Sequence, residues 1–285
     1  MVIEYRIQLD GVSHPVIISD EPEALLAAQA AGRAIIGVQG DGNKWYLKGV
    51  SYVIPGFEDA SRELAQLVLR RHLGLPWLIA STGRLVIREF VEEDADHIPE
   101  EEYGAQEGVF RSRELLALYI DRQYGFYEYG TWALTEKETD VLGGMAGVSN
   151  PRLPEEMEEL LYQNDPDRTV PWLELGYHIF RPYRRRGYGA EAVSAIMDYA
   201  HEVLDVRLCA LIDEKNQASR AMAERLGMEC IRETRILPPI READNRSPTG
   251  DAGTQPPVRE TGTRPSQGQL LYAERWISPP DREDP

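Results

Sequence analysis

A short basic stretch at residues 184–189 has the residue types and spacing to hold a diphosphate. Its sequence, Arg-Arg-Arg-Gly-Tyr-Gly, fits the pattern (Arg or Gln)-x-x-Gly-x-(Gly or Ala). Gly187 and Gly189 permit turns and a close backbone approach that a Cβ would block. An amphipathic segment follows, so main-chain N–H groups and the positive end of a helix would face the anion. The sequence therefore predicts an anion-binding turn here.

Two titratable side chains precede this turn on one predicted strand, residues 172–180. The period-2 alternation of a strand places Glu174 and His178 on the same face, with Gly176 between them. A carboxylate or an imidazole in this position can take a proton from a nucleophile. Each residue also has a structural interpretation. Glu174 can pair with a basic neighbour, and His178 can pack or shape a substrate pocket.

The segments after the turn alternate between helix and strand. Residues 188–204 carry apolar side chains at helical spacing, and residues 207–212 form a strand. Asn216 begins a helix that Gly227 ends. Asn216 contacts a ligand, caps its helix, or does both, and Ser219 is a ligand contact or a first-turn residue. The last strands are expected at residues 229–235 and 269–276.

The segments before the turn supply the rest of a sheet. Strands are expected at residues 84–90, 132–135 and 141–148, and a helix at 112–124. Gly143 and Gly144 inside a strand indicate a bulge, a bend or a close backbone approach. Residues 150–171 form an insertion with a short acidic helix at 155–162.

Four of these segments, in this order, resemble the GNAT N-acetyltransferase superfamily. The resemblance covers roughly residues 82–236 and 269–276 and is closest to the branch of ribosomal-protein N-terminal alanine acetyltransferases. The matching segments are TGRLVIREFVEEDAD, ELGYHIFRPYRRRGYGAEAV, Asn216-Gln217-Ala218-Ser219 and Arg225-Leu226-Gly227-Met228.

The resemblance implies a mixed α/β (α+β) sheet that uses acetyl-CoA as co-substrate. Acetyl would pass directly to a primary amine, on a protein N-terminus or a small molecule. Related enzymes often carry a catalytic glutamate at the position of Glu174, and His178 is the second catalytic candidate. Main-chain N–H groups near residues 177–179 would stabilise charge on the thioester oxygen. The implied cofactor-binding residues are Tyr177, Ile179, Arg184, Arg185, Arg186, Gly187, Tyr188, Gly189, Ala190, Asn216 and Ser219.

One position departs from the family pattern. Many members carry a tyrosine that protonates the departing thiolate, and Ala223 stands at the matching position here. A thiolate is a good leaving group and can depart without a dedicated acid. The alternative is a non-catalytic sensor that binds an acyl-CoA or a metabolite.

Residues 1–75 are expected to form a separate, non-catalytic α/β domain. Residues 16–19, 23–31 and 34–38 predict a parallel βαβ unit, with Asp20 as helix N-cap, Pro22 near the first helical position and Gly32 ending the helix. A further strand at 51–54 and a helix at 59–73 complete it. Residues 14–65 roughly resemble the fourth-motif region of haloacid dehalogenase-type phosphatases. The nucleophile motif of that family is missing, because Leu9-Asp10-Gly11-Val12 offers only one aspartate. The domain would bind a small ligand, dock a partner or serve a structural role.

Composition narrows the remaining possibilities. A net charge of −17 argues against a nucleic-acid partner, and no apolar run is long enough to cross a membrane. Two cysteines favour a reducing cytoplasm, and the five histidines lack metal-ligand spacing, so no metal is expected. We therefore expect a cytoplasmic two-domain enzyme, monomeric or homodimeric, with the acetyltransferase domain at residues 82–276. Residues 237–268 form a disordered insertion in that domain, and residues 277–285 a loose tail.

Overall fold

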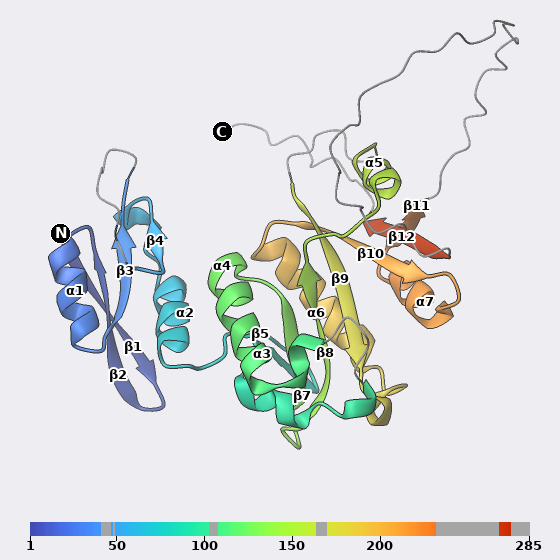
Figure 1. Cartoon of the computed structure of the whole chain (residues 1–285), viewed down its shortest axis with the longest axis horizontal. Coiled ribbons are helices and arrows are strands. Elements are labelled where there is room, and N and C mark those ends of the chain that lie inside the picture. The colour runs from blue at the N-terminus through green and yellow to red at the C-terminus, as the bar shows by residue number, and fades with distance from the viewer. Residues whose placement is uncertain (41–46, 48, 103–107, 164–169, 232–267, 275–285) are drawn as a thin grey trace, which may run out of the picture. The chain divides into compact units, whose positions relative to one another are not determined.

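The computed structural model describes residues 1–40, 47, 49–102, 108–163, 170–231 and 268–274 (Figure 1). The fold is α/β with mixed sheets, as predicted. The chain divides into two compact units, described in turn. The first contains Met1–Gly147 and Tyr177–Tyr199, and the second contains Val148–Gly176 and Ala200–Pro285.

A four-stranded sheet is built from the first 54 residues. Its order is β1 (Val2–Leu9), β2 (Val12–Ser19), β3 (Ala34–Val38) and β4 (Val53–Ile54). β2 and β3 are parallel and joined by α1 (Pro22–Ala30), and β4 is parallel to β3. The predicted parallel βαβ unit is confirmed. Gly32 follows the helix with a φ of +68°, the conformation that favours glycine after a helix end.

In this region the structure adds one strand that was not predicted and corrects one predicted helix cap. β1 was not predicted, although Ile3, Tyr5 and Ile7 alternate with polar residues and β1 pairs antiparallel with β2. Asp10 and Gly11, with φ values of 48° and 78°, make the hairpin turn that Asp-Gly favours. The N-cap of α1 is Glu21 rather than Asp20, whose carboxylate instead binds the N-terminal ammonium of Met1.

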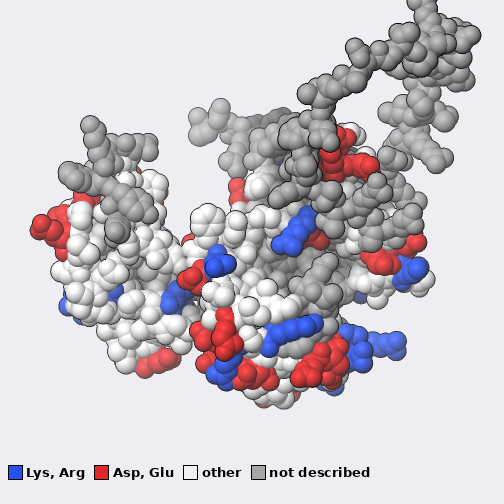
Figure 2. Space-filling model, viewed as in Figure 1, with Lys and Arg blue, Asp and Glu red and all other residues white. Residues whose placement is uncertain are grey.

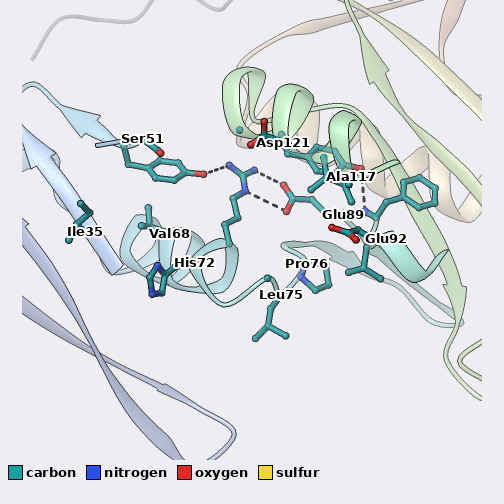
Figure 3. Close-up of a pocket in the computed structure, with 18 of the residues that line it drawn as sticks. Ile35, Ser51, Val68, His72, Leu75, Pro76, Glu89, Glu92, Ala117 and Asp121 are labelled. Carbon is teal, nitrogen blue, oxygen red and sulfur yellow. Dashed lines mark hydrogen bonds and ion pairs between the residues drawn. The ribbon is translucent and has the colours of Figure 1, made fainter. Parts of the chain in front are cut away.

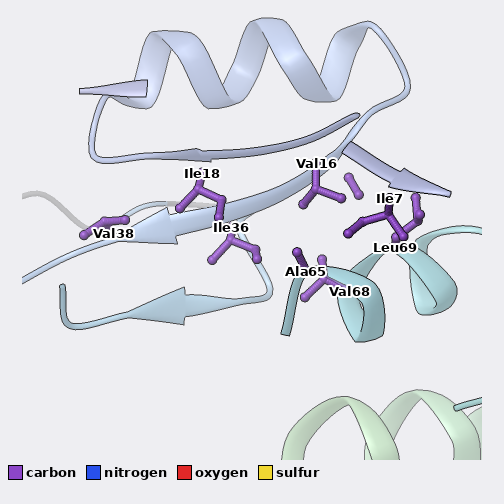
Figure 4. Close-up of a cluster of buried hydrophobic side chains, with 9 residues drawn as sticks. Ile7, Val16, Ile18, Ile36, Val38, Ala65, Val68 and Leu69 are labelled. Carbon is purple, nitrogen blue, oxygen red and sulfur yellow. The ribbon is translucent and has the colours of Figure 1, made fainter. Parts of the chain in front are cut away.

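A hydrophobic cluster between this sheet and α2 (Arg62–His72) gives residues 1–75 a core of their own (Figure 4). Val16, Ile18 and Ile36 are fully buried in it, each at 0% exposure. α2 begins where the Ser61 side chain accepts a hydrogen bond from the Leu64 N–H. That cap and the apolar stripe of α2 explain why the helix forms and which face it buries.

The rest of the first unit carries a second set of strands. Neighbours in the order β5 (Leu78–Ser81), β6 (Leu85–Arg88), β7 (Thr131–Glu136) and β8 (Leu142–Ser149) pair antiparallel. β5 was not predicted, because it is only four residues long and has no clear alternation. Ser112 caps α3 (Arg113–Tyr119), which continues as a π-helix (Ile120–Tyr124) and α4 (Gly125–Tyr127). The 3₁₀ helices within the described residues are Phe57–Asp59, Glu92–His97, Glu100–Glu102, Gly108–Arg111 and Arg181–Tyr183.

The predicted close approach at the β8 glycines is confirmed. A Cβ on Gly144 would lie 2.5 Å from the carbonyl oxygen of His178, and one on Gly143 would lie 3.3 Å from the ring of Tyr183. The Phe180 N–H donates to the Gly143 carbonyl at 3.0 Å. The glycines of β8 therefore let the segment that leads into the loop at 184–189 lie directly against it.

The second unit continues from β9 (Trp172–Ile179), whose residues are shared between the units. The order here is β9, β10 (Arg207–Asp213), β12 (Gln269–Glu274), β11 (Met228–Ile231). The predicted pairing of the last two strands is confirmed, and β12 also pairs antiparallel with β10. Its helices are α5 (Glu155–Gln163) and α7 (Gln217–Arg225), while α6 (Tyr188–Glu202) begins in the first unit.

Several predicted features fall on residues outside this description. Residues 237–267 of the predicted disordered insertion and the predicted tail at 277–285 are among them. Among the described residues, no helix combines the length and the apolar character needed to span a membrane.

Candidate active site

The loop at residues 184–189 follows β9 and the 3₁₀ helix Arg181–Tyr183 in the first unit, and its last two residues begin α6. Gly187 has a φ of +84° and Arg185 a φ of +59°, so the backbone turns through the left-handed region twice. Helix α6 begins at Tyr188, and the N–H groups of its first turn have no acceptor within the helix. Arg184, Arg185, Arg186 and Gly187 are exposed. This arrangement fits a diphosphate bound by the main chain and the helix end.

A salt-bridged pair that the sequence did not reveal holds this loop. The Arg84 guanidinium is 2.6 Å from the Glu191 carboxylate and donates to the Arg186 carbonyl oxygen at 2.7 Å. It also lies over the Tyr188 ring, 4.6 Å from its centroid. Because Arg84 and Glu191 are far apart in the chain, no local pattern could have linked them.

Two aromatic rings stack on each other at the loop. The rings of Tyr183 and Tyr188 stack at 6.4 Å, and the Arg186 guanidinium lies 5.4 Å from the Tyr183 centroid. The Tyr188 hydroxyl donates to the Glu136 carboxylate, which raises the pKa of Tyr188 and lowers that of Glu136. These contacts fix the side chain of one predicted cofactor-binding residue, Tyr188, against β7.

A buried carboxylate meets the start of the same loop. Glu102 accepts hydrogen bonds from His178 Nε2 at 2.9 Å, the Arg181 N–H at 2.6 Å and the Arg184 guanidinium at 2.9 Å. Arg184 also donates to the Ile179 carbonyl at 2.7 Å. The structure thus brings His178 and Arg184 together on Glu102, a residue that sequence reasoning missed.

Glu174, the first catalytic candidate, is half-buried in the second unit. Burial raises the pKa of its carboxyl, and the Arg152 N–H, a donor at 3.3 Å, only partly offsets this. The β9–β10 ladder comprises three pairs and ends at Glu174–Cys209. Gly176, two residues on, has open space where a Cβ would stand. A carboxyl with a raised pKa beside open space can serve as a proton acceptor.

The predicted Asn216 and Ser219 contacts lie in the second unit and form a helix cap. The Asn216 side chain accepts from the Ser219 N–H at 3.1 Å, which begins α7. Ala223, where the family often has a tyrosine, is buried at 5% exposure. The Tyr272 hydroxyl of β12 contacts this helix, because it donates to the Glu224 carboxylate at 3.2 Å and accepts from the Arg220 guanidinium at 3.2 Å. The capping interpretation of Asn216 therefore holds, and its ligand contact stays a prediction.

Thiol chemistry and metal binding are two other activities that such residues can support. Burial, followed by the charge of Glu174, raises the pKa of the Cys209 thiol to about 12, so this thiol stays protonated at neutral pH. No group of three His, Cys, Asp or Glu side chains suited to a metal ion occurs among the described residues.

A separate cavity of about 720 Å³ lies within the first unit (Figure 3). It is lined by Ser51, Val68 and His72 from the first 75 residues and by Glu92, Ala117 and Asp121 from later segments. At its wall the Arg71 guanidinium contacts the Glu89 carboxylate at 2.5 Å and the Tyr52 hydroxyl at 2.8 Å. Arg71 therefore pairs with both Glu89 and Tyr52, and we interpret this cluster as structural.

Surface charge does not form one basic patch on the face shown in Figure 2. Acidic and basic side chains are interspersed there. The basic residues of the loop are a local feature of a chain whose net charge is −17. This distribution suits an anionic small molecule at the loop better than a long polyanion.

Comparison with known proteins identifies the family of most of this region. The family described as "Acetyltransferase (GNAT) domain" matches residues 84–229, just over half of the chain. "Uncharacterized protein YkkB" of Bacillus subtilis is 32% identical over 103 residues, 36% of this chain and 52% of that protein. The chain thus spans about half the length of this curated relative.

The solved structures that match this chain are more distant in sequence. An acetyltransferase from Agrobacterium tumefaciens is 22% identical, covering 69% of this chain and 94% of that one, with a TM-score of 0.43. A ribosomal-protein-S5-alanine acetyltransferase from Vibrio fischeri is 15% identical, covering 55% and 84%, with a TM-score of 0.40. On the strength of the family match over residues 84–229, this chain belongs to the GNAT acetyltransferase family.

Proposed function

We propose that this protein transfers the acetyl group of acetyl-CoA directly to a primary amine, on a protein N-terminus or a small molecule. The observation that carries the proposal is the loop at 184–189. Its Gly187 turn, exposed arginines and helix N-terminus form an anion site inside the region that matches the family.

Binding would use the main chain more than the side chains. The N–H groups of Gly187, Tyr188, Gly189 and Ala190 would hold the diphosphate, with Arg185 and Arg186 adding long-range attraction. Tyr177 and Ile179 on β9, and Asn216 and Ser219 on α7, would contact the pantetheine arm. Bound acetyl-CoA supplies an activated thioester, and the residues of this chain bind it and manage the proton.

Proton transfer is assigned to Glu174, with His178 as the second candidate. The amine attacks only when neutral, so a base must take its proton, directly or through water. The half-buried Glu174 carboxylate, with its raised pKa, is suited to accept that proton. Main-chain N–H groups of β9 near Tyr177–Ile179 would stabilise the charge on the thioester oxygen. With Ala223 at the usual acid position, the thiolate would leave unaided and take its proton from water.

The first 75 residues are proposed to be a non-catalytic module. A sheet and core of their own support a separate domain, and its likeness to a haloacid dehalogenase-type fold stays a prediction. A cytoplasmic location and a monomeric or homodimeric state are part of the same proposal.

The direct test measures free thiol released from acetyl-CoA over a panel of amines and N-terminal peptides. Omitting the amine provides the control for simple hydrolysis. Amine-dependent thiol release with a matching acetylated product would establish the activity.

A non-catalytic sensor is the competing proposal, and Ala223 is the residue that favours it. Tight binding of acetyl-CoA without thiol release for any acceptor would support the sensor. Binding can be measured on the same protein by titration calorimetry, so the two proposals give different results.

A further inference from the structure

One buried carboxylate has no role in the proposed reaction, and yet it contacts the cofactor loop. Glu102 lies at the end of the 3₁₀ helix Glu100–Glu102, and its side chain is only 2% exposed. Glu100 and Glu101, its neighbours in that helix, are exposed. A carboxylate is rarely buried unless it is paired and hydrogen-bonded, so the donors around Glu102 must matter to the fold.

The donors to Glu102 among the described residues come from one segment, residues 178–184. They are the imidazole of His178, the main-chain N–H of Arg181 and the guanidinium of Arg184. Burial alone would raise the pKa of Glu102, but these three donors outweigh it and hold the pKa below its ordinary value. Glu102 is therefore ionised at neutral pH and accepts all three hydrogen bonds.

The contact decides what Arg184 can do. Its guanidinium donates to the Glu102 carboxylate at 2.9 Å and to the Ile179 carbonyl oxygen at 2.7 Å. Arg184, the first residue of the loop pattern, thus connects the loop to Glu102 and to the end of β9. The exposed Arg185 and Arg186 and the main chain are left to meet the anion.

The contact also decides the state of the His178 ring. An ionised carboxylate only accepts hydrogen bonds, so Nε2 of His178 must carry the proton in that bond. The Arg184 guanidinium, 3.5 Å from Nε2, is then a second donor to the same carboxylate. In the neutral ring Nδ1 is then the acceptor atom. The tautomer of His178 is set from outside β9, by a residue 76 positions earlier in the chain.

We propose that Glu102 is a positioning residue that fixes the loop at 181–189 for coenzyme A and holds His178 in its Nε2–H form. The proposal rests on the proposed function for the identity of the ligand. The geometry of the four residues stands independently of catalysis.

The first test measures binding of coenzyme A itself by titration calorimetry. Glu102→Gln keeps the size of the side chain but replaces one acceptor oxygen with a donor that faces other donors. Its dissociation constant for coenzyme A should rise about tenfold or more, the usual cost of a hydrogen bond to a charged group. Glu101→Gln, one residue away and exposed, should bind as the parent does. Equal binding by all three proteins would overturn the proposal.

A double-mutant cycle shows whether Glu102 acts through Arg184. Arg184→Met removes the guanidinium but keeps most of the apolar stem. In that background Glu102→Gln should weaken binding clearly less than it does alone. Fully additive losses would contradict the positioning role.

The ring state supplies a readout that general destabilisation does not move. In ¹⁵N-histidine spectra, assigned with His178→Asn, the His178 Nε2 signal should be that of a protonated nitrogen and should shift in Glu102→Gln. An unchanged tautomer would overturn that half of the proposal. If thiol release fails for every amine while binding and tautomer respond as expected, the proposed function fails and the inference stands.

Discussion

The Glu191 carboxylate accepts hydrogen bonds from the main-chain N–H and from the Nε of Arg84, each at 2.8 Å. The Thr82 hydroxyl donates to the same carboxylate at 2.6 Å. Burial alone would raise the pKa of Glu191, but these donors hold it below its ordinary value. An acidic residue in the first turn of α6 is thus neutralised, which leaves the helix end able to receive an anion.

The first prediction concerns this pair. Arg84→Ala leaves the Glu191 charge uncompensated beside the loop and frees the Arg186 carbonyl. Coenzyme A should bind about tenfold more weakly, because hydrogen bonds to charged groups contribute roughly 1.5–3 kcal/mol each. Calorimetric titration measures the change.

Lys137→Ala is the control, because the Lys137 ammonium donates to the nearby Thr82 carbonyl oxygen and its removal leaves the Arg84–Glu191 pair in place. Unaltered binding by Arg84→Ala would show that the pair does not support the loop.

The second prediction concerns Glu174 and pH. Its carboxyl must be ionised to accept a proton, so kcat/KM should rise as pH passes through a pKa above the ordinary value for glutamate. Glu174→Gln should lower kcat about a hundredfold or more and remove that acidic limb. The assay should use an acceptor amine that stays neutral over the whole pH range, so that titration of the amine does not contribute to the pH dependence of kcat/KM. Glu4→Gln, on β1, is the control.

The raised pKa of Glu174 also predicts how stability changes with pH. A carboxyl with a raised folded-state pKa binds its proton more tightly in the folded protein. Its contribution to stability is therefore present at low pH and is lost as pH rises through the folded pKa. Denaturation at alkaline pH should show Glu174→Gln to be more stable than the parent. A parent and variant with parallel stability curves would refute the raised pKa.

The third prediction uses two glycines on adjacent strands. Gly144→Ala puts a Cβ 2.5 Å from the His178 carbonyl and should cost about 1–3 kcal/mol of unfolding free energy. Gly176→Ala meets open space and should change stability by no more than about 0.5 kcal/mol. The added methyl of Gly176→Ala should still reduce acetyl transfer, because it fills space beside Glu174.

Urea unfolding and thiol release on both variants separate these effects. If Gly176→Ala retains full activity, the open space beside it is not used by the reactants.

The fourth prediction concerns the buried pair of Arg71 and Glu89, whose side chains are 13% and 5% exposed. The Trp77 N–H donates to the same Glu89 carboxylate at 3.0 Å. Arg71→Met leaves that carboxylate without its counter-ion and should lower the unfolding free energy by about 3–5 kcal/mol. Arg62→Met, at the exposed start of α2, should cost far less.

The double variant Arg71→Met/Glu89→Leu should recover part of the loss, because no unpaired charge remains buried. Additive losses would mean that the two side chains contribute independently.

Local patterns in the sequence determined much of the fold. The alternation in residues 172–180, the helical stripe after residue 188 and the glycine that ends each of α1 and α7 were each predicted from a few neighbouring residues. So was the turn at Gly187, because a positive φ is a property that glycine accepts locally. β1 was not predicted, although Ile3, Tyr5 and Ile7 alternate with polar residues and Asp10-Gly11 is a hairpin-turn sequence.

Tertiary structure alone decided which charges meet. Glu102 and His178 are 76 residues apart, and Arg84 and Glu191 are 107 apart, so nothing in the spacing marks them as partners. Among the glutamates at 100–102 only Glu102 is buried, and the sequence does not distinguish it from the other two. A local pattern reports backbone preference and which face is apolar. The partner of a charge depends on how strands and loops from distant parts of the chain pack, and packing fixes both the donors and the desolvation that set its pKa.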